Sequence, residues 1–160
     1  MRMSRASAYA ISAALQLADT PPKVPIPCSQ LAKTGEMPER FLLQVLRNLV
    51  NHGLLKSTRG VDGGYYLLRP ASEITLLSIV EATDGPLTPT VPPLNGLSEA
   101  SRECLHALLK DITADACRRM AAVKLTDLRS AKSSDLDAPG SYFDAEADAE
   151  VEVDQRLNRL

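Results

Sequence analysis

The feature that most constrains this chain is a loop with three glycines between two short runs of apolar and aromatic residues. The runs are residues 54–57 (LLKS) and 65–68 (YYLL), and the loop between them is 58–64 (TRGVDGG). Short strand-like runs joined by a glycine-containing loop predict one β-hairpin with a flexible tip. Aromatic residues make up 4% of the 160 residues and Trp is absent, so the core beside this hairpin must be aliphatic.

Three helices are expected before the hairpin. The first spans residues 3–17, and the second, 28–33, follows a proline-rich loop at 21–27 that cannot be helical. The third opens at Pro38, which suits a first helical turn, and ends near Gly53. Its apolar residues follow the i, i+3, i+4, i+7 spacing that buries one helix face. They are Leu42, Val45, Leu46 and Leu49.

Beyond the hairpin the chain predicts a fourth helix, a linker and one long helix. Residues 75–84 form the fourth helix with Thr75 as its cap, and the prolines of 86–97 predict a linker. Residues 98–123 carry an apolar stripe over about six turns, more than one thin domain can cover. We therefore expect a partner helix, and so a homodimer, at Leu105, Leu108, Leu109, Ile112, Ala116 and Met120.

Three helices followed by a hairpin is the element order of a winged helix-turn-helix. The fold class expected is therefore mainly α with a small β-hairpin. A winged helix-turn-helix domain would occupy residues 1–85, and a dimerisation region with a short last helix at 126–131 would occupy 98–132. Residues 133–160 are acidic and contain few core formers, so we expect a largely disordered tail.

The charges are divided unevenly along the chain. Residues 1–70 carry nine Lys/Arg against four Asp/Glu, whereas residues 134–160 carry two against eight. A basic first half favours a nucleic-acid partner. On the third helix, the face away from the apolar stripe offers Arg40 and Arg47 for phosphate or guanine and Gln44 for adenine.

Several segments match one family in the same order along the chain. They include Tyr9-Ala10, Gly53-Leu54-Leu55 and above all residues 57–65 (STRGVDGGY). Over about residues 1–130 the chain resembles the bacterial winged-helix regulators that include the iron–sulfur cluster regulator IscR, the nitric-oxide sensor NsrR and the cysteine-metabolism repressor CymR. The resemblance implies a homodimeric transcriptional regulator, most simply a repressor, that binds palindromic operators in double-stranded DNA. The contacts to DNA would come from Pro38, Arg40, Phe41, Leu43, Gln44, Arg47, Ser57, Arg59, Gly60, Gly63 and Gly64.

The chain departs from the cluster-binding members of that family. They carry three closely spaced cysteines before the long helix, whereas residues 86–103 contain none and Cys104 stands at the position of the last one. Cys104 and His106 are two residues apart, or about 200° around a helix, so they point to different sides. An acidic ligand of some relatives corresponds to Ala8 here. We expect no metal, no iron–sulfur cluster and no other cofactor.

Two further residues bear on specificity and sensing. Leu43 stands where IscR-like proteins have a base-reading glutamate, and leucine cannot accept a hydrogen bond from cytosine, so a different operator is expected. Cys28, like Cys104, is a candidate redox-active thiol, although a small packing residue is the simpler interpretation. An unknown small-molecule effector is the other candidate signal.

The motifs of common enzymes are absent from the sequence: there is no Walker loop, HExxH, GxSxG or paired CxxC. We therefore expect no catalytic role. The three cysteines show no pairing pattern, which indicates a reducing cytoplasm, and no apolar run is long enough to cross a membrane. Two alternatives stay open. One is a winged-helix adapter that binds protein rather than DNA, and the other is an iron–sulfur redox sensor with unusual ligands.

Overall fold

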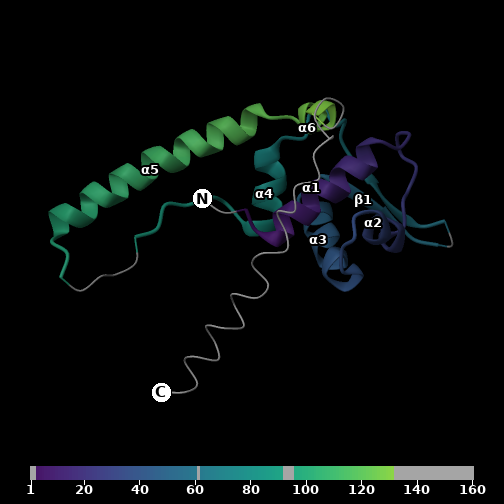
Figure 1. Ribbon diagram of the computed structural model, residues 1–160, viewed down its shortest axis with the longest axis horizontal. Helices are drawn as coiled ribbons and strands as arrows, with labels where there is room; N and C mark the ends of the chain where they lie inside the picture. The colour runs from purple at the N-terminus through teal and green to yellow at the C-terminus, as the bar shows by residue number, and fades with distance from the viewer. Residues whose placement is uncertain (1–2, 61, 92–95, 132–160) are drawn as a thin grey trace, which may run out of the picture. The chain divides into compact units, whose positions relative to one another are not determined.

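The computed structural model describes residues 3–60, 62–91 and 96–131, and within them it confirms a mainly helical fold with one hairpin (Figure 1). The predicted acidic tail at 133–160 and part of the predicted linker, 92–95, lie outside the described residues. In chain order the elements are α1 (Arg5–Ala18), α2 (Cys28–Thr34), α3 (Glu39–Asn51), β1 (Leu55–Thr58), β2 (Gly64–Leu67), α4 (Leu76–Asp84), α5 (Glu99–Ala122) and α6 (Leu125–Ala131).

Short polar side chains begin three of these helices. The Ser4 hydroxyl accepts a hydrogen bond from the Ser7 amide at the start of α1, and Ser98 does the same for Ser101 at the start of α5. At α4, Thr75 and Ser78 cap each other's backbone amides reciprocally. These local bonds satisfy amides that a helix start leaves without partners, so the sequence sets the helix boundaries closely.

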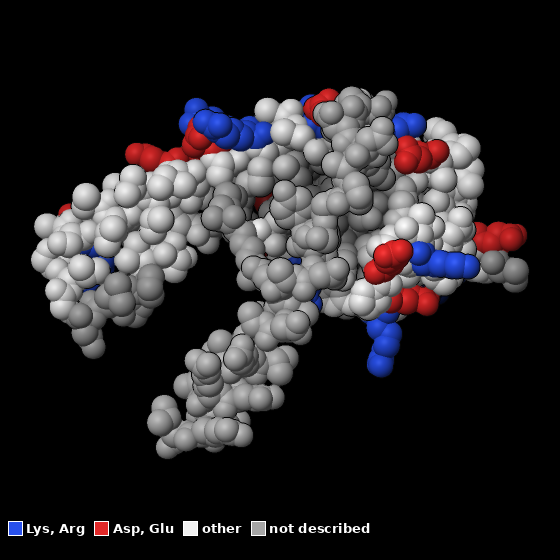
Figure 2. Space-filling model, in the orientation of Figure 1, with Lys and Arg blue, Asp and Glu red and all other residues white. Residues whose placement is uncertain are grey.

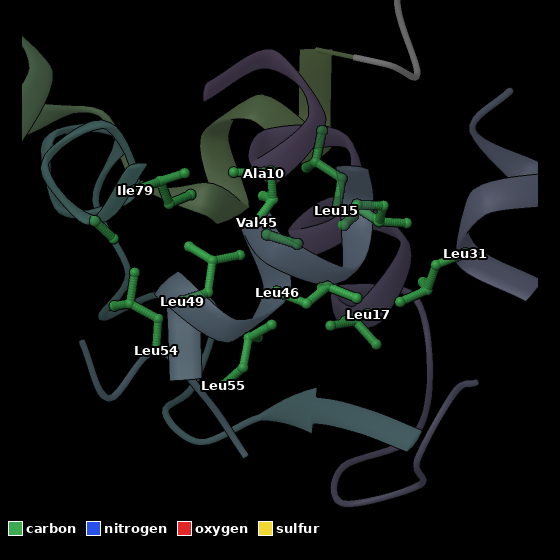
Figure 3. Close-up of a cluster of buried hydrophobic side chains, with 14 of the residues drawn as sticks. Ala10, Leu15, Leu17, Leu31, Val45, Leu46, Leu49, Leu54, Leu55 and Ile79 are labelled. Atoms are coloured by element: carbon green, nitrogen blue, oxygen red, sulfur yellow. The ribbon is translucent and has the colours of Figure 1, made fainter. Parts of the chain in front are cut away.

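An aliphatic core holds the first four helices and the hairpin together (Figure 3). The predicted stripe of α3 is confirmed, because Leu42, Val45, Leu46 and Leu49 are at most 2% exposed. Small residues of α1, among them Ala10 and Ala13, are fully buried and let this helix approach closely. Burying each large aliphatic side chain contributes about 1.5–3 kcal/mol, so the stripe fixes α3 firmly with its opposite face outward.

The hairpin differs by one residue from the expected strands. The antiparallel register pairs Leu55 with Leu67 and Thr58 with Gly64, which shortens the tip loop to residues 59–63. Gly64 belongs to the strand through its pairing with Thr58, and β2 also pairs with an earlier segment. Ile26 and Tyr65 exchange two backbone hydrogen bonds of 2.9 Å. A glycine was expected to prolong the loop, whereas here it allows a third backbone to approach the strand.

The long helix α5 is joined to the rest of the compact unit Met1–Ser130 at its C-terminal end. The Leu76 amide donates to the Val123 carbonyl at 2.9 Å, and the Leu125 amide donates to the Ile74 carbonyl at 2.8 Å. Leu125 is fully buried in the core. None of the α5 residues, in contrast, is buried. The junction therefore orients α5, while the helix itself contributes little to the core.

Candidate nucleic-acid interface

The outward face of α3 presents a row of polar side chains. Arg40, Gln44 and Arg47 are all exposed, on the side opposite the buried stripe. Pro38 is exposed immediately before the helix and occupies its N-cap position rather than the first turn. Leu43, which the sequence places with this row, is half-buried, so only part of its side chain is available to a ligand. Guanidinium and amide groups in this arrangement can bind phosphate oxygens and base edges.

The orientation of Gln44 is fixed by a neighbour that the sequence reasoning missed. The Gln44 amide nitrogen donates to the Asn48 side-chain oxygen at 3.2 Å, one helical turn further on. His52 is exposed one turn beyond Asn48, and its Nδ1 lies 2.9 Å from the Asn48 carbonyl oxygen. The i, i+4 spacing of Gln44 and Asn48 is the signal that could have predicted this contact.

The hairpin tip presents Ser57 and Arg59 to solvent, and its three glycines serve different purposes. Gly60 has a φ of 114°, a conformation that side-chain-bearing residues rarely adopt. A Cβ on Gly63 would lie 2.7 Å from the Thr58 carbonyl oxygen, and a Cβ on Gly64 would overlap the Ile26 carbonyl group. Gly63 and Gly64 were predicted as DNA contacts, and the structure gives both a role in close backbone packing. Gly64 is buried and Gly63 half-buried.

An aromatic pair lies at the border of the α3 face. Phe41 is 44% exposed, although the other large apolar residues of α3 are buried or half-buried. Its ring meets that of Tyr9 from α1, with the centroids 5.7 Å apart and the planes inclined at 77°. Edge-to-face geometry of this kind is favourable for aromatic rings. The sequence indicates Tyr9 only through the family resemblance, because a contact with a residue 32 positions away has no local signature.

Charges of both signs are present on the molecular face of Figure 2, together with a mostly uncharged surface along α5. The six residues predicted for dimerisation divide into two sets. Leu105, Leu108 and Ile112 are 39%, 56% and 55% exposed. Leu109, Ala116 and Met120 are half-buried. Ala116 and Met120, together with one side of the exposed Ile112, line a groove of about 540 Å³ between α4 and α5. Leu76 and Val80 of α4 form part of its apolar wall.

Comparison with known proteins decides the family. The Rrf2 family, described as iron-dependent transcriptional regulators, matches residues 3–131. The chain belongs to the Rrf2 family. It is 30% identical over 114 residues to the HTH-type transcriptional regulator IscR of Escherichia coli, covering 71% of this chain and 70% of IscR. It is 39% identical over 87 residues to Rv1287, a proposed HTH-type regulator of Mycobacterium tuberculosis, and covers 54% of each chain. The chain thus spans about half the length of that relative.

Solved structures agree with this placement. The global cysteine regulator CymR of Bacillus subtilis aligns with a TM-score of 0.64 and 27% identity, covering 82% of this chain and 98% of CymR. A regulator from Listeria innocua aligns with a TM-score of 0.65 and 27% identity, covering 89% of this chain and 95% of that one. The Rrf2 family and the relative IscR are both described as transcriptional regulators.

The described residues of this Rrf2 chain do not fit an iron centre held by one protomer. Within residues 3–60, 62–91 and 96–131, no three His, Cys, Asp or Glu side chains converge to hold a metal ion. Cys104 and His106 are both exposed on α5, and Cys117 lies farther along the same helix. Clusters and structural metals need three or four convergent ligands. The described residues of one protomer therefore do not by themselves provide the convergent ligand set that an iron centre needs.

The environment of Cys28 disfavours a reactive thiolate. The residue is half-buried at the start of α2, with its sulfur 3.9 Å from the Glu39 carbonyl oxygen. Burial, and next the negative charge of Glu39, raises the pKa of the Cys28 thiol. Reactive cysteines need a lowered pKa, so the geometry favours the packing interpretation of Cys28.

In the described part of the chain, no helix is long and apolar enough to cross a bilayer.

Proposed function

We propose that this Rrf2 chain acts as a homodimer that binds a palindromic operator in double-stranded DNA and represses transcription without a bound cluster. The observation that carries the proposal is the exposed row Arg40, Gln44 and Arg47 on a helix whose other face is locked into the core. A rigid helix with solvent-exposed cationic and amide groups meets the requirement for insertion into a major groove.

The hairpin would add contacts outside the groove entered by α3. Arg59 and Ser57 are exposed near its tip, and Lys56 is exposed on β1. Such groups bind phosphates without reading sequence, so they would raise the affinity for every duplex. Gln44 and the exposed part of Leu43 would supply sequence choice through adenine and thymine edges.

The homodimer would form through α5. Leu105, Leu108 and Ile112 leave a row of large apolar side chains in water along a helix that is 24 residues long. A second copy of the same helix would cover this row with its own apolar row. Two-fold pairing of the two copies also suits a palindromic site. A repressor would then act by occupying the operator. A cytoplasmic location and an unidentified small-molecule effector complete the proposal.

Salt-dependent DNA binding tests the proposal. Purified protein is titrated with a random-sequence duplex and with a duplex selected from a random library, at several salt concentrations. We expect tighter binding to the selected duplex and a steep loss of affinity for both as salt rises. Arg59→Ala should weaken binding to both duplexes about tenfold and lower the salt slope by about one. Arg129→Ala is the matched control, because it removes a cation that pairs with Asp19 at 2.8 Å.

Equal DNA affinity of Arg59→Ala and the wild type would remove the hairpin from the interface. No binding to any duplex would favour the protein-binding adapter instead. Iron analysis after anaerobic purification separates the remaining alternative. We expect a colourless protein without iron, whereas about two irons per chain would mean that ligands from two protomers combine into a cluster site.

A further inference from the structure

Phe41 is unusual among the apolar residues of α3. The four residues of the core stripe are buried, yet the Phe41 ring is 44% exposed beside the cationic Arg40. An aromatic ring in this position offers an apolar contact of the kind that recognises a thymine methyl group. Such a contact discriminates between bases only if the ring is held in one orientation.

The group that holds the ring comes from another helix. Tyr9 of α1 packs against the core with part of its side chain and meets Phe41 with its ring at a centroid distance of 5.7 Å. The edge-to-face angle of 77° restricts the rotation of Phe41 on one side. Because α1 is anchored by fully buried residues such as Ala10 and Ala13, Tyr9 is a fixed support.

We propose that Tyr9 is a positioning residue for sequence recognition, which acts by fixing the Phe41 ring against the DNA. The inference rests on the proposed function, since it assigns a selectivity role within the same DNA-reading face. Tyr9 needs no contact with DNA in this role. Its loss should therefore lower affinity for the preferred sequence more than affinity for duplex DNA in general.

A double-mutant cycle tests the inference on intact protein. Tyr9→Leu, Phe41→Ala and the double variant are titrated with the duplex selected by the wild type and with a scrambled duplex of equal length. Tyr9→Leu should weaken binding to the selected duplex roughly three- to tenfold, the range that an aromatic pair supplies, and binding to the scrambled duplex less than twofold. In the Phe41→Ala background, Tyr9→Leu should have no further effect. Tyr9→Phe, which keeps the ring, should bind like the wild type.

Tyr9 also touches the core, so Tyr9→Met is made in parallel to fill a similar volume without a ring. Equal losses on the selected and scrambled duplexes, or an undiminished loss in the Phe41→Ala background, would overturn the positioning role. A loss of selectivity in Tyr9→Phe, which keeps the aromatic ring, would overturn the positioning role as well. If the wild type binds no duplex, the proposed DNA-binding function fails instead, and the two failures are thus distinguishable.

Discussion

Helix α3 and helix α5 each carry a row of large apolar residues, but the two rows have different surroundings. The stripe of α3 is enclosed by α1, α4 and the hairpin, and its large aliphatic residues are almost completely buried. Helix α5 is nearly twice as long and has no buried residue at all. The contrast shows that one helix of this chain buries its large apolar residues within the core, whereas the other leaves several of them exposed to solvent. The helix that carries the proposed DNA-reading face is of the first kind, and the helix that carries the proposed dimer contact is of the second.

The largest expected effect contrasts the two helices directly. Leu46→Ala removes a fully buried side chain of α3 and should lower the free energy of unfolding by about 2–5 kcal/mol. Leu105→Ala, on the exposed side of α5, should change it by less than about 0.5 kcal/mol when the protein is monomeric. Urea denaturation at low protein concentration measures both. Similar losses for the two variants would mean that α5 is packed as firmly as α3.

The second prediction addresses the exposed side of α5. Leu108→Glu places a charge in the apolar row and should weaken self-association about thirtyfold or more, as expected for a central interface residue. Ala114→Glu is the matched control because Ala114 is exposed on the other side of the same helix. Sedimentation equilibrium measures the dissociation constants. If Ala114→Glu dissociates the protein and Leu108→Glu does not, the dimer contact has been assigned to the wrong side.

The third prediction concerns the joint between the hairpin and the chain before α2. Gly64→Ala should destabilise the fold by about 1–3 kcal/mol, because the added methyl group overlaps the Ile26 carbonyl. Gly53→Ala is the comparison: its φ is 68° but no atom lies near the added group, so about 1 kcal/mol is expected. Thermal unfolding ranks the two. A milder effect at Gly64 would show that β2 can move away from Ile26.

The smallest expected effect concerns the cysteines. The raised pKa of Cys28 means that the folded state favours its neutral thiol. Cys28 therefore contributes stability below the ordinary thiol pKa of 9.0, and this contribution is lost as the pH rises through the raised folded value. The free energy of unfolding, measured from pH 7 to 10, should fall less steeply with pH for Cys28→Ser than for the wild type.

Alkylation at pH 8 should modify the exposed Cys104 before Cys28, and preferential labelling of Cys28 would contradict this.

Local patterns predicted most of the fold. The period of Leu42, Val45, Leu46 and Leu49 fixed both the existence and the buried face of α3, and Thr75 marked the start of α4. These features depend on residues within a few positions of one another. The one-residue error in the hairpin arose because Gly64 is kept small by Ile26, which lies 38 positions earlier in the chain.

The candidate site was predicted less completely than the fold. Arg40, Gln44 and Arg47 were placed correctly on the outward face by helical periodicity alone. Leu43 lies close enough to the core side of the same helix to be half-buried, which a simple division into two faces did not resolve. The support of Phe41 by Tyr9 joins two helices, and no spacing within either helix indicates it.

The sequence by itself determined the helices, the hairpin and the cationic row, since periodicity, capping and glycine content act over short stretches of chain. Tertiary structure alone decided which apolar residues of α5 rest on α4 and which remain in water. It also decided that Gly64 is a packing residue and that Tyr9 supports Phe41. These outcomes depend on which distant segments meet, and the free energy of such contacts comes from burial and shape at the meeting point rather than from local preference.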